Sequence, residues 1–514
     1  MKLIKLLTVS FIFASFIVQS ANCATLRYVS PADPTKTPSL KDTNKEDSII
    51  YVKPQKATLS HNDISNHYEI AMQRFRQANV KSAYMDFAVL IRHIIPNDYT
   101  YMKLADELSE IGLFTLSDEA INKVSDKEIS FTQSEDVKKF YFPKIVPAKE
   151  DEIYLAEIYS NIMYNAQSKE ATAELIKNNA LLTKYDYANY VAALGSLKTG
   201  NLQNADMYIN NALKMNPDNI NYQKLKIEIV LQEDKPKEAS KILENIKKTK
   251  FNTTEFQNRI TTLEYYTAYK CEKNDSMKKY YLGAYYHSIG EDLKAVRTLQ
   301  MGVSNKKKSN KLIYGLLAAT YYSQKEYEKA QNFAEKAVQL GGNDYNAVIT
   351  LGKINYRNGN YKEALKFFKM LNSDNQALVW TAMAYNALGN SKQAKDIYLK
   401  ILKDSSNCPE AYYNIAIMDN DRTVEYLKKS VAINLNYIDG WLELARNKLI
   451  LNNITEASKY LDIVKNIDEN DFRYYYYQGL VFKAKGLQQE ANYYFAKSHA
   501  INPDYELAKK ELGI

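Results

Sequence analysis

The stretch Gly352-Lys353-Ile354-Asn355-Tyr356-Arg357-Asn358-Gly359-Asn360-Tyr361-Lys362-Glu363-Ala364 contains the spacing on which the fold depends. Two small residues, Gly352 and Ala364, lie seven residues before and five residues after Gly359. A Gly seven residues past a helix midpoint ends that helix, because Gly enters the left-handed backbone conformation at little cost. The small residues on either side allow the two helices to approach closely. The stretch therefore predicts a helix–turn–helix hairpin.

The same spacing recurs in four other places. Each has a small residue seven positions before a Gly and an Ala five positions after it: Ala193, Gly200 and Ala205; Gly283, Gly290 and Ala295; Ala382, Gly389 and Ala394; Gly479, Gly486 and Ala491. Between these anchors, apolar residues recur at helical spacing, as at Tyr314, Leu317, Ala318 and Tyr321. One hairpin leaves apolar surface exposed and the next covers it, so a continuous stack of hairpins is expected.

This pattern resembles the tetratricopeptide repeat, a helix–turn–helix unit of about 34 residues. The units would start at Asp186, Ile220, Ser276, Lys311, Tyr345, Asn375, Pro409, Ile438 and Phe472. The resemblance implies an all-α, right-handed superhelical solenoid. It also implies that the first helix of each unit lines a concave wall, where a partner would bind.

Interruptions of the register predict the domain organisation. In chain order we expect a signal peptide at 1–24, a Pro-containing polar tether at 25–63, two degenerate repeats at 64–131, an irregular linker at 132–151, further repeats at 152–253, an extra helix at 254–275, the main array at 276–505 and a capping helix at 506–514. The linker is expected because Phe140-Tyr141-Phe142-Pro143 and Pro147 fit an irregular crossing better than a helix.

The first residues have the features of a secretory signal. A basic start with Lys2 and Lys5 precedes a largely apolar run from Leu6 to Val18 and then small residues that offer cleavage sites. The run is shorter than the ~20 residues that span a bilayer as a helix. We expect an exported chain, periplasmic or extracellular, that does not span the membrane once the signal is removed. An uncleaved anchor and a lipidated Cys23 are the alternatives.

Composition favours helices and does not favour nucleic acid as a partner. The chain has 16 Gly and 11 Pro among 514 residues, fewer than strands, hairpins and phosphate loops require. Its net charge of +8 is small beside 68 basic and 60 acidic residues. The basic runs 247–250 and 306–308 are interpreted as solvated turns. Cys271 and Cys408 lie about four helical pairs apart, too far for a disulfide, and are expected to be separate thiols.

Catalytic and ligand-binding motifs are absent from the sequence. The five histidines form no H-E-x-x-H pair, and the chain has no Gly-rich phosphate loop and no G-x-S-x-G turn. We therefore predict a binding protein without catalytic residues, cofactor or metal. Lys224 with Glu228, and Ile349 with Lys353, also depart from the Lys and Asn that family members use to clamp a peptide's C-terminal carboxylate.

The resemblance identifies candidate groove residues by their position in each unit. These are Tyr187, Tyr190, Tyr280, His287, Tyr322, Tyr356, Tyr413 and Tyr476, with Ile349, Val379 and Met383 between them. Tyr combines apolar area with a hydroxyl, which suits a protein-binding surface. The alternative is that these positions only reflect the 43 Tyr of the chain. We expect a scaffold in envelope assembly or organisation that binds a protein or peptide segment. A carbohydrate- or cell-wall-associated module and an accessory subunit of an envelope enzyme complex remain alternatives, and the oligomeric state is open.

Overall fold

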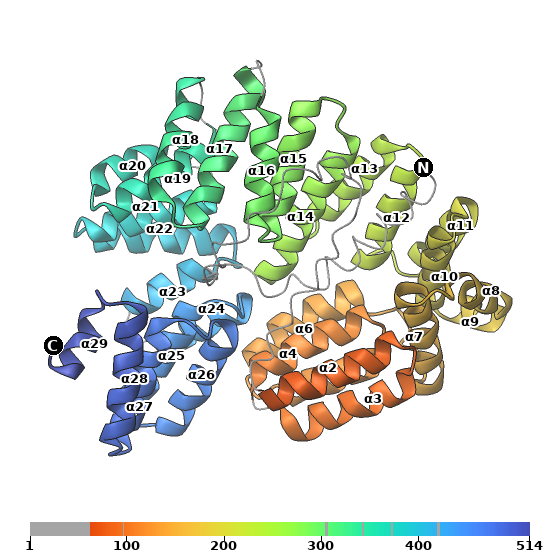
Figure 1. Ribbon diagram of the computed structural model, residues 1–514, viewed down its shortest axis with the longest axis horizontal. Helices are drawn as coiled ribbons and strands as arrows, with labels where there is room; N and C mark the ends of the chain where they lie inside the picture. Colours follow the sequence, from red (N-terminus) through yellow and green to blue (C-terminus); the bar gives the residue numbers. More distant parts are fainter. Residues whose placement is uncertain (1–61, 96, 304–306, 342–343, 372–373, 419–421) are drawn as a thin grey trace, which may run out of the picture.

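The computed structural model describes residues 62–514, except 96, 304–306, 342–343, 372–373 and 419–421. The predicted signal peptide (1–24) and all but the last two residues of the predicted tether (25–63) lie outside the described residues. Within the described part of the chain, every regular element is a helix (Figure 1). The prediction of an all-α helical solenoid is confirmed.

The helices follow one another with short connections. The first part contains α2 (Asn62–Arg76), α3 (Val80–Val89), the π-helix η2 (Leu90–Ile94), α4 (Asp98–Glu110), α5 (Phe114–Lys123), α6 (Lys127–Tyr141), α7 (Lys149–Tyr164), α8 (Ser168–Lys177) and α9 (Asn179–Lys184). The middle part contains α10 (Asp186–Lys198), α11 (Leu202–Met215), α12 (Ile220–Gln232), α13 (Pro236–Lys247), α14 (Thr254–Cys271), α15 (Asp275–Ser288), α16 (Asp292–Gly302), α17 (Lys307–Ser323) and α18 (Tyr327–Gln339). The last part contains α19 (Tyr345–Arg357), α20 (Tyr361–Lys369), α21 (Asn375–Ala387), α22 (Ser391–Asp404), α23 (Pro409–Met418), α24 (Thr423–Ile433), α25 (Ile438–Ile450), α26 (Ile454–Ile467), α27 (Phe472–Ala484), α28 (Gln488–Ile501) and α29 (Glu506–Leu512).

The hairpin of α19 and α20 shows why the small residues recur. Gly359 has φ of +78°, the left-handed conformation that ends α19, and its N–H donates to the Tyr356 carbonyl over 3.0 Å. A Cβ placed on Gly352 would lie 2.3 Å from the ring of Phe368 on the partner helix. Ala364 is fully buried. Close contact between the two helices therefore requires the small residues.

The first helices of the units lie on the inner side of the curve. In the array, α15 packs on α17, α17 on α19 and α19 on α21, whereas no comparable packing joins α16, α18 and α20 within the described residues. In a curved array, successive repeats are closer together on the inner side than on the outer side. Helices that pack on one another across successive units therefore lie on the inner side. The inner face of the array is therefore formed by α15, α17, α19 and α21.

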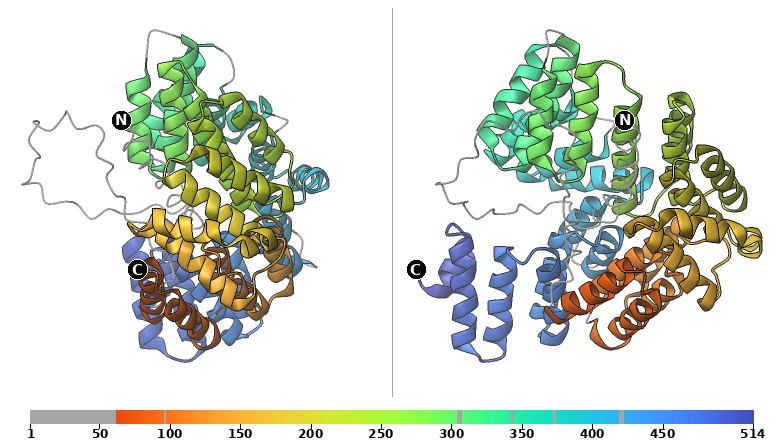
Figure 2. Two further views of the ribbon diagram at one scale, coloured as in Figure 1. Left: turned by 90° about the vertical axis from the view of Figure 1, so that its right-hand side faces the viewer. Right: turned by 45° about the vertical axis from the view of Figure 1, so that its right-hand side comes forward.

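The solenoid curves far enough for its ends to meet. Figure 1 shows α24 beside α6, and both views of Figure 2 place the N-terminal helices (red to orange) and the C-terminal helices (blue) at the same end of the molecule. The Gln133 side-chain amide donates to the Ala432 carbonyl over 2.7 Å, and the Tyr99 hydroxyl donates to Asn436 over 3.0 Å. One continuous hydrophobic core joins residues between Ile64 and Tyr285 to residues between Ala416 and Val481. The array is thus a closed ring rather than an open spiral.

The prediction of an irregular linker at 132–151 is wrong over its first half and again at its end. Helix α6 continues to Tyr141 and α7 begins at Lys149, so only 142–148 lack regular structure. Asp126 caps α6 by accepting from two backbone N–H groups, and Val137, Phe140 and Tyr141 are buried. The aromatic run is the last turn of a helix whose apolar side is covered by distant segments, and that environment stabilises the helix.

Candidate functional site

Three of the eight candidate tyrosine and histidine positions are buried, so their predicted role as groove lining is wrong. Tyr187 and Tyr190 are each 3% exposed and Tyr476 is 8% exposed. The Tyr187 ring lies 4.9 Å edge-on from Phe114, and the Tyr190 ring stacks on Tyr222 at 5.1 Å.

The inner side of α10 and α12 is covered by the chain itself. Helix α6 packs on α12, and the Asn219 side-chain amide donates to the Tyr141 carbonyl over 3.1 Å at the end of α6. The Asn216 amide donates to the next carbonyl, that of Phe142, also over 3.1 Å. The segment predicted as a linker therefore fills the first part of the expected groove. At the other end, Phe495 of α28 and Tyr505, just before α29, pack on Tyr476.

The other five candidates, Tyr280, His287, Tyr322, Tyr356 and Tyr413, are half-buried on first helices of the array.

His287 is held within the array rather than presented for chemistry. Its Nδ1 lies 2.7 Å from Asp292 Oδ1, and the Ser323 hydroxyl donates to Asp292 Oδ2 over 2.7 Å. The serine therefore contacts the carboxylate and not the imidazole, which is not the arrangement of an activated nucleophile. The three residues tie α15, α16 and α17 together.

A cluster of three aromatic rings and one amine lies on α17, α19 and α21. This Lys353 cluster consists of Tyr322, Lys353, Tyr356 and Trp380, all half-buried. The Lys353 Nζ lies 5.8 Å from the Tyr322 ring centroid and 5.5 Å from the Trp380 ring centroid. The Tyr356 and Trp380 rings meet edge-on at 5.4 Å. The cluster thus offers aromatic surface and a positive charge across three successive repeats.

The Lys353 amine lacks a polar partner within the described part of the chain. Burial lowers its pKa to about 8, against the opposing influence of Asp374 and Glu410. Asp374 Oδ1 accepts from the Tyr345 hydroxyl and from the Ala377 N–H, each over 2.9 Å, rather than from the Lys353 amine. The amine is desolvated and contacts only ring faces, which replace part of its lost hydration.

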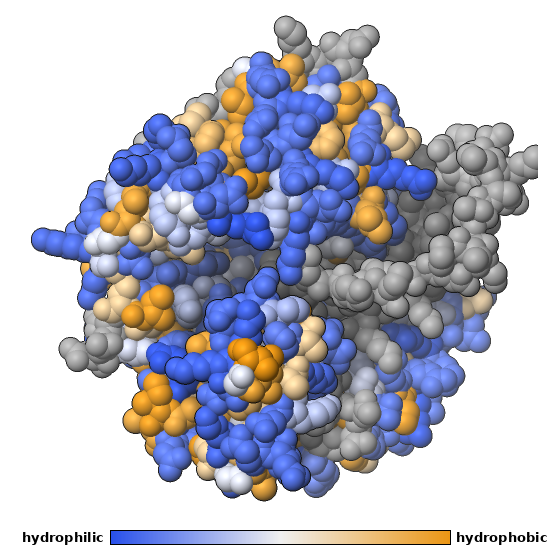
Figure 3. Space-filling model, turned by 60° about the vertical axis from the view of Figure 1, so that its left-hand side comes forward, coloured by the Kyte–Doolittle hydropathy of each residue, from blue (hydrophilic) through white to orange (hydrophobic). Residues whose placement is uncertain are grey.

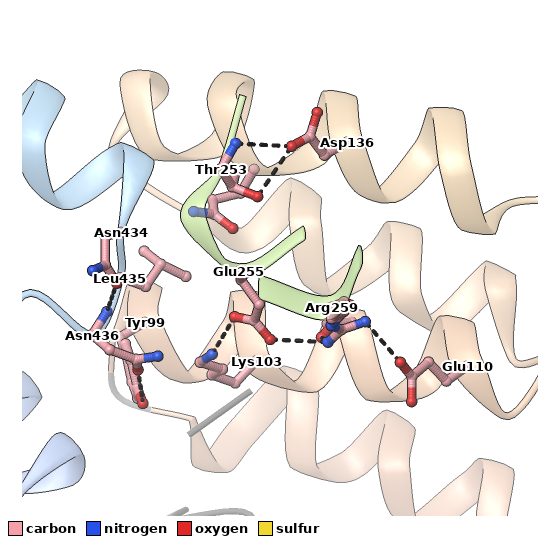
Figure 4. A network of polar contacts seen from close by, with 12 residues as sticks. Tyr99, Lys103, Glu110, Asp136, Thr253, Glu255, Arg259, Asn434, Leu435 and Asn436 are labelled. Atoms are coloured by element: carbon pink, nitrogen blue, oxygen red, sulfur yellow. Dashed lines mark hydrogen bonds and ion pairs between the residues drawn. The ribbon is translucent and has the colours of Figure 1, made fainter. Parts of the chain in front are cut away.

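A second polar cluster lies where the ring closes. Figure 4 shows Arg259 of α14 reaching Glu110 of α4 over 2.8 Å and Glu255 over 2.9 Å, while Lys103 pairs with Glu255 over 2.7 Å. Arg259 also contacts Asp106 and the Tyr141 hydroxyl. Burial raises the pKa of Glu110 to about 7.

The cavity beside this second cluster is small. It measures about 10 Å³ and is lined by Met102, Gln133 and Leu435 among others, which is room for about one water molecule. No organic substrate fits there. Among the described residues there is also no group of three or more His, Cys, Asp or Glu placed to hold a metal ion. We therefore interpret the cluster as part of the ring closure.

On the face in Figure 3, apolar patches are separate and surrounded by hydrophilic residues. In the described ranges between residues 62 and 514, no helix has the combined length and apolar content needed to cross a bilayer.

Sequence reasoning did not identify Trp380 or the role of Lys353. Trp380 is one of only two Trp in the chain, which was an available signal. It lies beside Val379 rather than at a position that the resemblance assigns to the groove. In the sequence, Lys353 only departs from the residue expected in a clamp for a C-terminal carboxylate, and nothing there places it beside two aromatic rings.

Comparisons with known proteins agree with the repeat pattern. Residues 321–384, which contain the whole Lys353 cluster, match the family model described as tetratricopeptide repeat. A search of curated proteins gives no match.

Several solved structures are similar to this chain. A tetratricopeptide repeat protein from Parabacteroides merdae is 15% identical with a TM-score of 0.37, covering 47% of this chain and 98% of its own. The Cut9-Hcn1 hetero-tetramer of APC/C is 12% identical with a TM-score of 0.30, covering 88% and 83%. YrrB, described as a tetratricopeptide repeat protein with an unusual peptide-binding site, is 18% identical with a TM-score of 0.21, covering 43% and 98%.

Proposed function

Because this chain is a helical repeat protein with tetratricopeptide repeats at residues 321–384, we propose that it is a scaffold that binds a segment of another protein on the inner face of its array. The observation that carries the proposal is the Lys353 cluster. Half-buried Tyr and Trp rings next to an amine without a polar partner are typical of a surface that a protein partner completes.

The position of the cluster supports this assignment. Helix α6 packs on α12, whereas the rings of the Lys353 cluster keep part of their surface accessible. A segment lying across α17, α19 and α21 would bury these rings further, and each such ring contributes apolar area at little cost in side-chain entropy.

Export and a role in envelope organisation form a separate part of the proposal. They rest on the leader-like residues 1–24, whose basic start and apolar run are typical of a secretory signal. Cell fractionation of the full chain with a C-terminal tag tests this part. Recovery of the tag in the cytoplasm at the mass of the uncleaved chain would contradict it.

A pull-down from native envelope extract tests the binding function. The wild-type chain, residues 25–514, is compared with the double variant Tyr322→Ala/Tyr356→Ala and with a control, Tyr493→Ala. Tyr493 is 62% exposed on α28, away from the array's inner face. The expected result is a discrete protein retained by the wild type and the control and lost by the double variant, with unchanged helicity by circular dichroism.

Two other results would contradict the proposal. Equal retention by all three chains would show that the Lys353 cluster is not the binding surface. Retention of glycan fragments but no protein, with loss in the double variant, would favour the carbohydrate-binding alternative, in which the same rings stack on sugars.

A further inference from the structure

Two other desolvated amines in the described part of the chain have polar partners. Lys103 pairs with Glu255 over 2.7 Å. The Lys198 amine donates to the carbonyls of Ile162 and Met163 over 2.9 and 3.1 Å. This is expected, because a desolvated charge without a partner is costly.

Lys353 differs from these amines. Its Nζ lies near two aromatic rings, and within the described residues it has neither an ion pair nor a hydrogen bond. Ring faces replace only part of the hydration of an ammonium group. A group that is partly desolvated and incompletely compensated on a candidate binding surface indicates that its partner is supplied from outside.

The surroundings restrict what that partner can be. Asp374 and Glu410 both act on Lys353 electrostatically without pairing with it. They would repel a strongly acidic segment. The adjoining Tyr356 and Trp380 rings, 5.4 Å apart, favour an apolar or aromatic neighbour.

We infer that Lys353 is a specificity-determining residue that pairs with a single Asp or Glu side chain of the bound segment, next to an apolar residue that packs on Tyr356 and Trp380. This inference rests on the proposed function. It concerns an internal acidic side chain, not a C-terminal carboxylate.

The test is a selection from random 12-residue peptides displayed at the N-terminus of a phage coat protein, so that no displayed peptide has a free C-terminal carboxylate. The targets are the wild-type chain, Lys353→Met and the control Lys362→Met. Lys362 is an exposed lysine on α20, the second helix of the same unit. Methionine keeps the approximate length of the side chain and removes its charge, and circular dichroism verifies that each variant is folded.

The wild type and the Lys362→Met control are expected to select peptides with one acidic residue next to an aromatic or aliphatic one. Lys353→Met is expected to keep the apolar preference and lose the acidic one. For a selected peptide, replacing its Asp or Glu by Asn or Gln should weaken binding to the wild type about tenfold or more and change binding to Lys353→Met little, because the charge-assisted contact is already absent.

The outcomes separate this inference from the proposed function. Selected peptides that have no acidic preference, or an acidic preference that Lys353→Met retains, would overturn the inference and leave peptide binding in place. Peptides that bind the wild type and the double variant Tyr322→Ala/Tyr356→Ala equally would contradict the proposed site and the inference together. Failure of every target to select a peptide would also count against both.

Discussion

Arg259 is the cation on which the polar cluster at the ring closure depends. Its side chain is 3% exposed and contacts Glu110, Glu255 and Asp106, of which Glu110 and Asp106 are 8% and 9% exposed. Replacing it by Met leaves these carboxyl groups buried without their shared cation. Breaking a buried ion pair from one side costs about 3–5 kcal/mol. We expect a loss near 3 kcal/mol at pH 7.5, because Lys103 still pairs with Glu255.

The loss should depend on pH in a defined direction. Burial already raises the pKa of Glu110 to about 7 in the wild type, although Arg259 opposes the rise. Without Arg259, the pKa of Glu110 and that of Asp106 rise further in the folded state. When a carboxyl group has a higher pKa in the folded state than in the unfolded state, the protein loses stability as the pH rises from the unfolded pKa to the folded pKa. The cost of Arg259→Met is therefore expected to be smaller at pH 5.5, where the carboxyl groups accept protons more readily.

Hydrogen exchange measured on peptides from α4 and α14 reports the loss of stability at the site of the substitution. A loss of about 3 kcal/mol corresponds to roughly 150-fold faster exchange, because every 1.4 kcal/mol changes the opening equilibrium about tenfold. Peptides from α18 provide an internal reference, and Arg422→Met provides a matched control, because its ion pair with Glu425 is exposed. An exposed pair contributes at most about 1 kcal/mol. Unchanged exchange in α4 and α14, or an equal loss at both pH values, would refute the reasoning.

Three further predictions concern single residues. Glu152 is fully buried and accepts hydrogen bonds from Thr115, and burial raises its pKa to about 7. The stability of the wild type should therefore fall as the pH rises from about 4.5 to 7. Urea denaturation of Glu152→Gln should show a smaller decline over this range, by up to about 3 kcal/mol. Gly352→Ala places a Cβ against Phe368 and should destabilise α19 and α20 by about 1–3 kcal/mol, seen as faster hydrogen exchange there. Gly359→Ala meets no neighbouring atom and should cost only the strain of a positive φ, about 1 kcal/mol, and the opposite ranking of these two variants would contradict the packing argument.

The hairpins could be predicted from sequence because their determinants are local. Gly359 ends α19, and Gly352 and Ala364 allow α19 and α20 to touch, all within thirteen residues of chain. Left-handed backbone and close helix contact restrict residue type strongly, so they leave a readable pattern. Residues 254–275 fall outside the repeat register and are therefore expected to form an extra helix; α14 lies at Thr254–Cys271.

The linker prediction failed for the opposite reason. The sequence Phe140-Tyr141-Phe142-Pro143 has no strong local preference for a helix, and burial by distant segments stabilises this end of α6. The Gln133 amide donates to the Ala432 carbonyl, 299 residues away in the sequence. The local sequence around either residue gives no indication of this contact.

Local spacing therefore determined the helical hairpins, their order and the positions that face inward. Tertiary structure alone decided which of those positions stay accessible. Tyr187 and Tyr356 occupy first helices of their units, yet Tyr187 is buried against Phe114 of α5, while Tyr356 remains half-buried beside Trp380 on the inner face. Whether a side chain at a given repeat position becomes core or binding surface depends on what lies opposite it, and that is set by how far the whole solenoid curves before its ends meet.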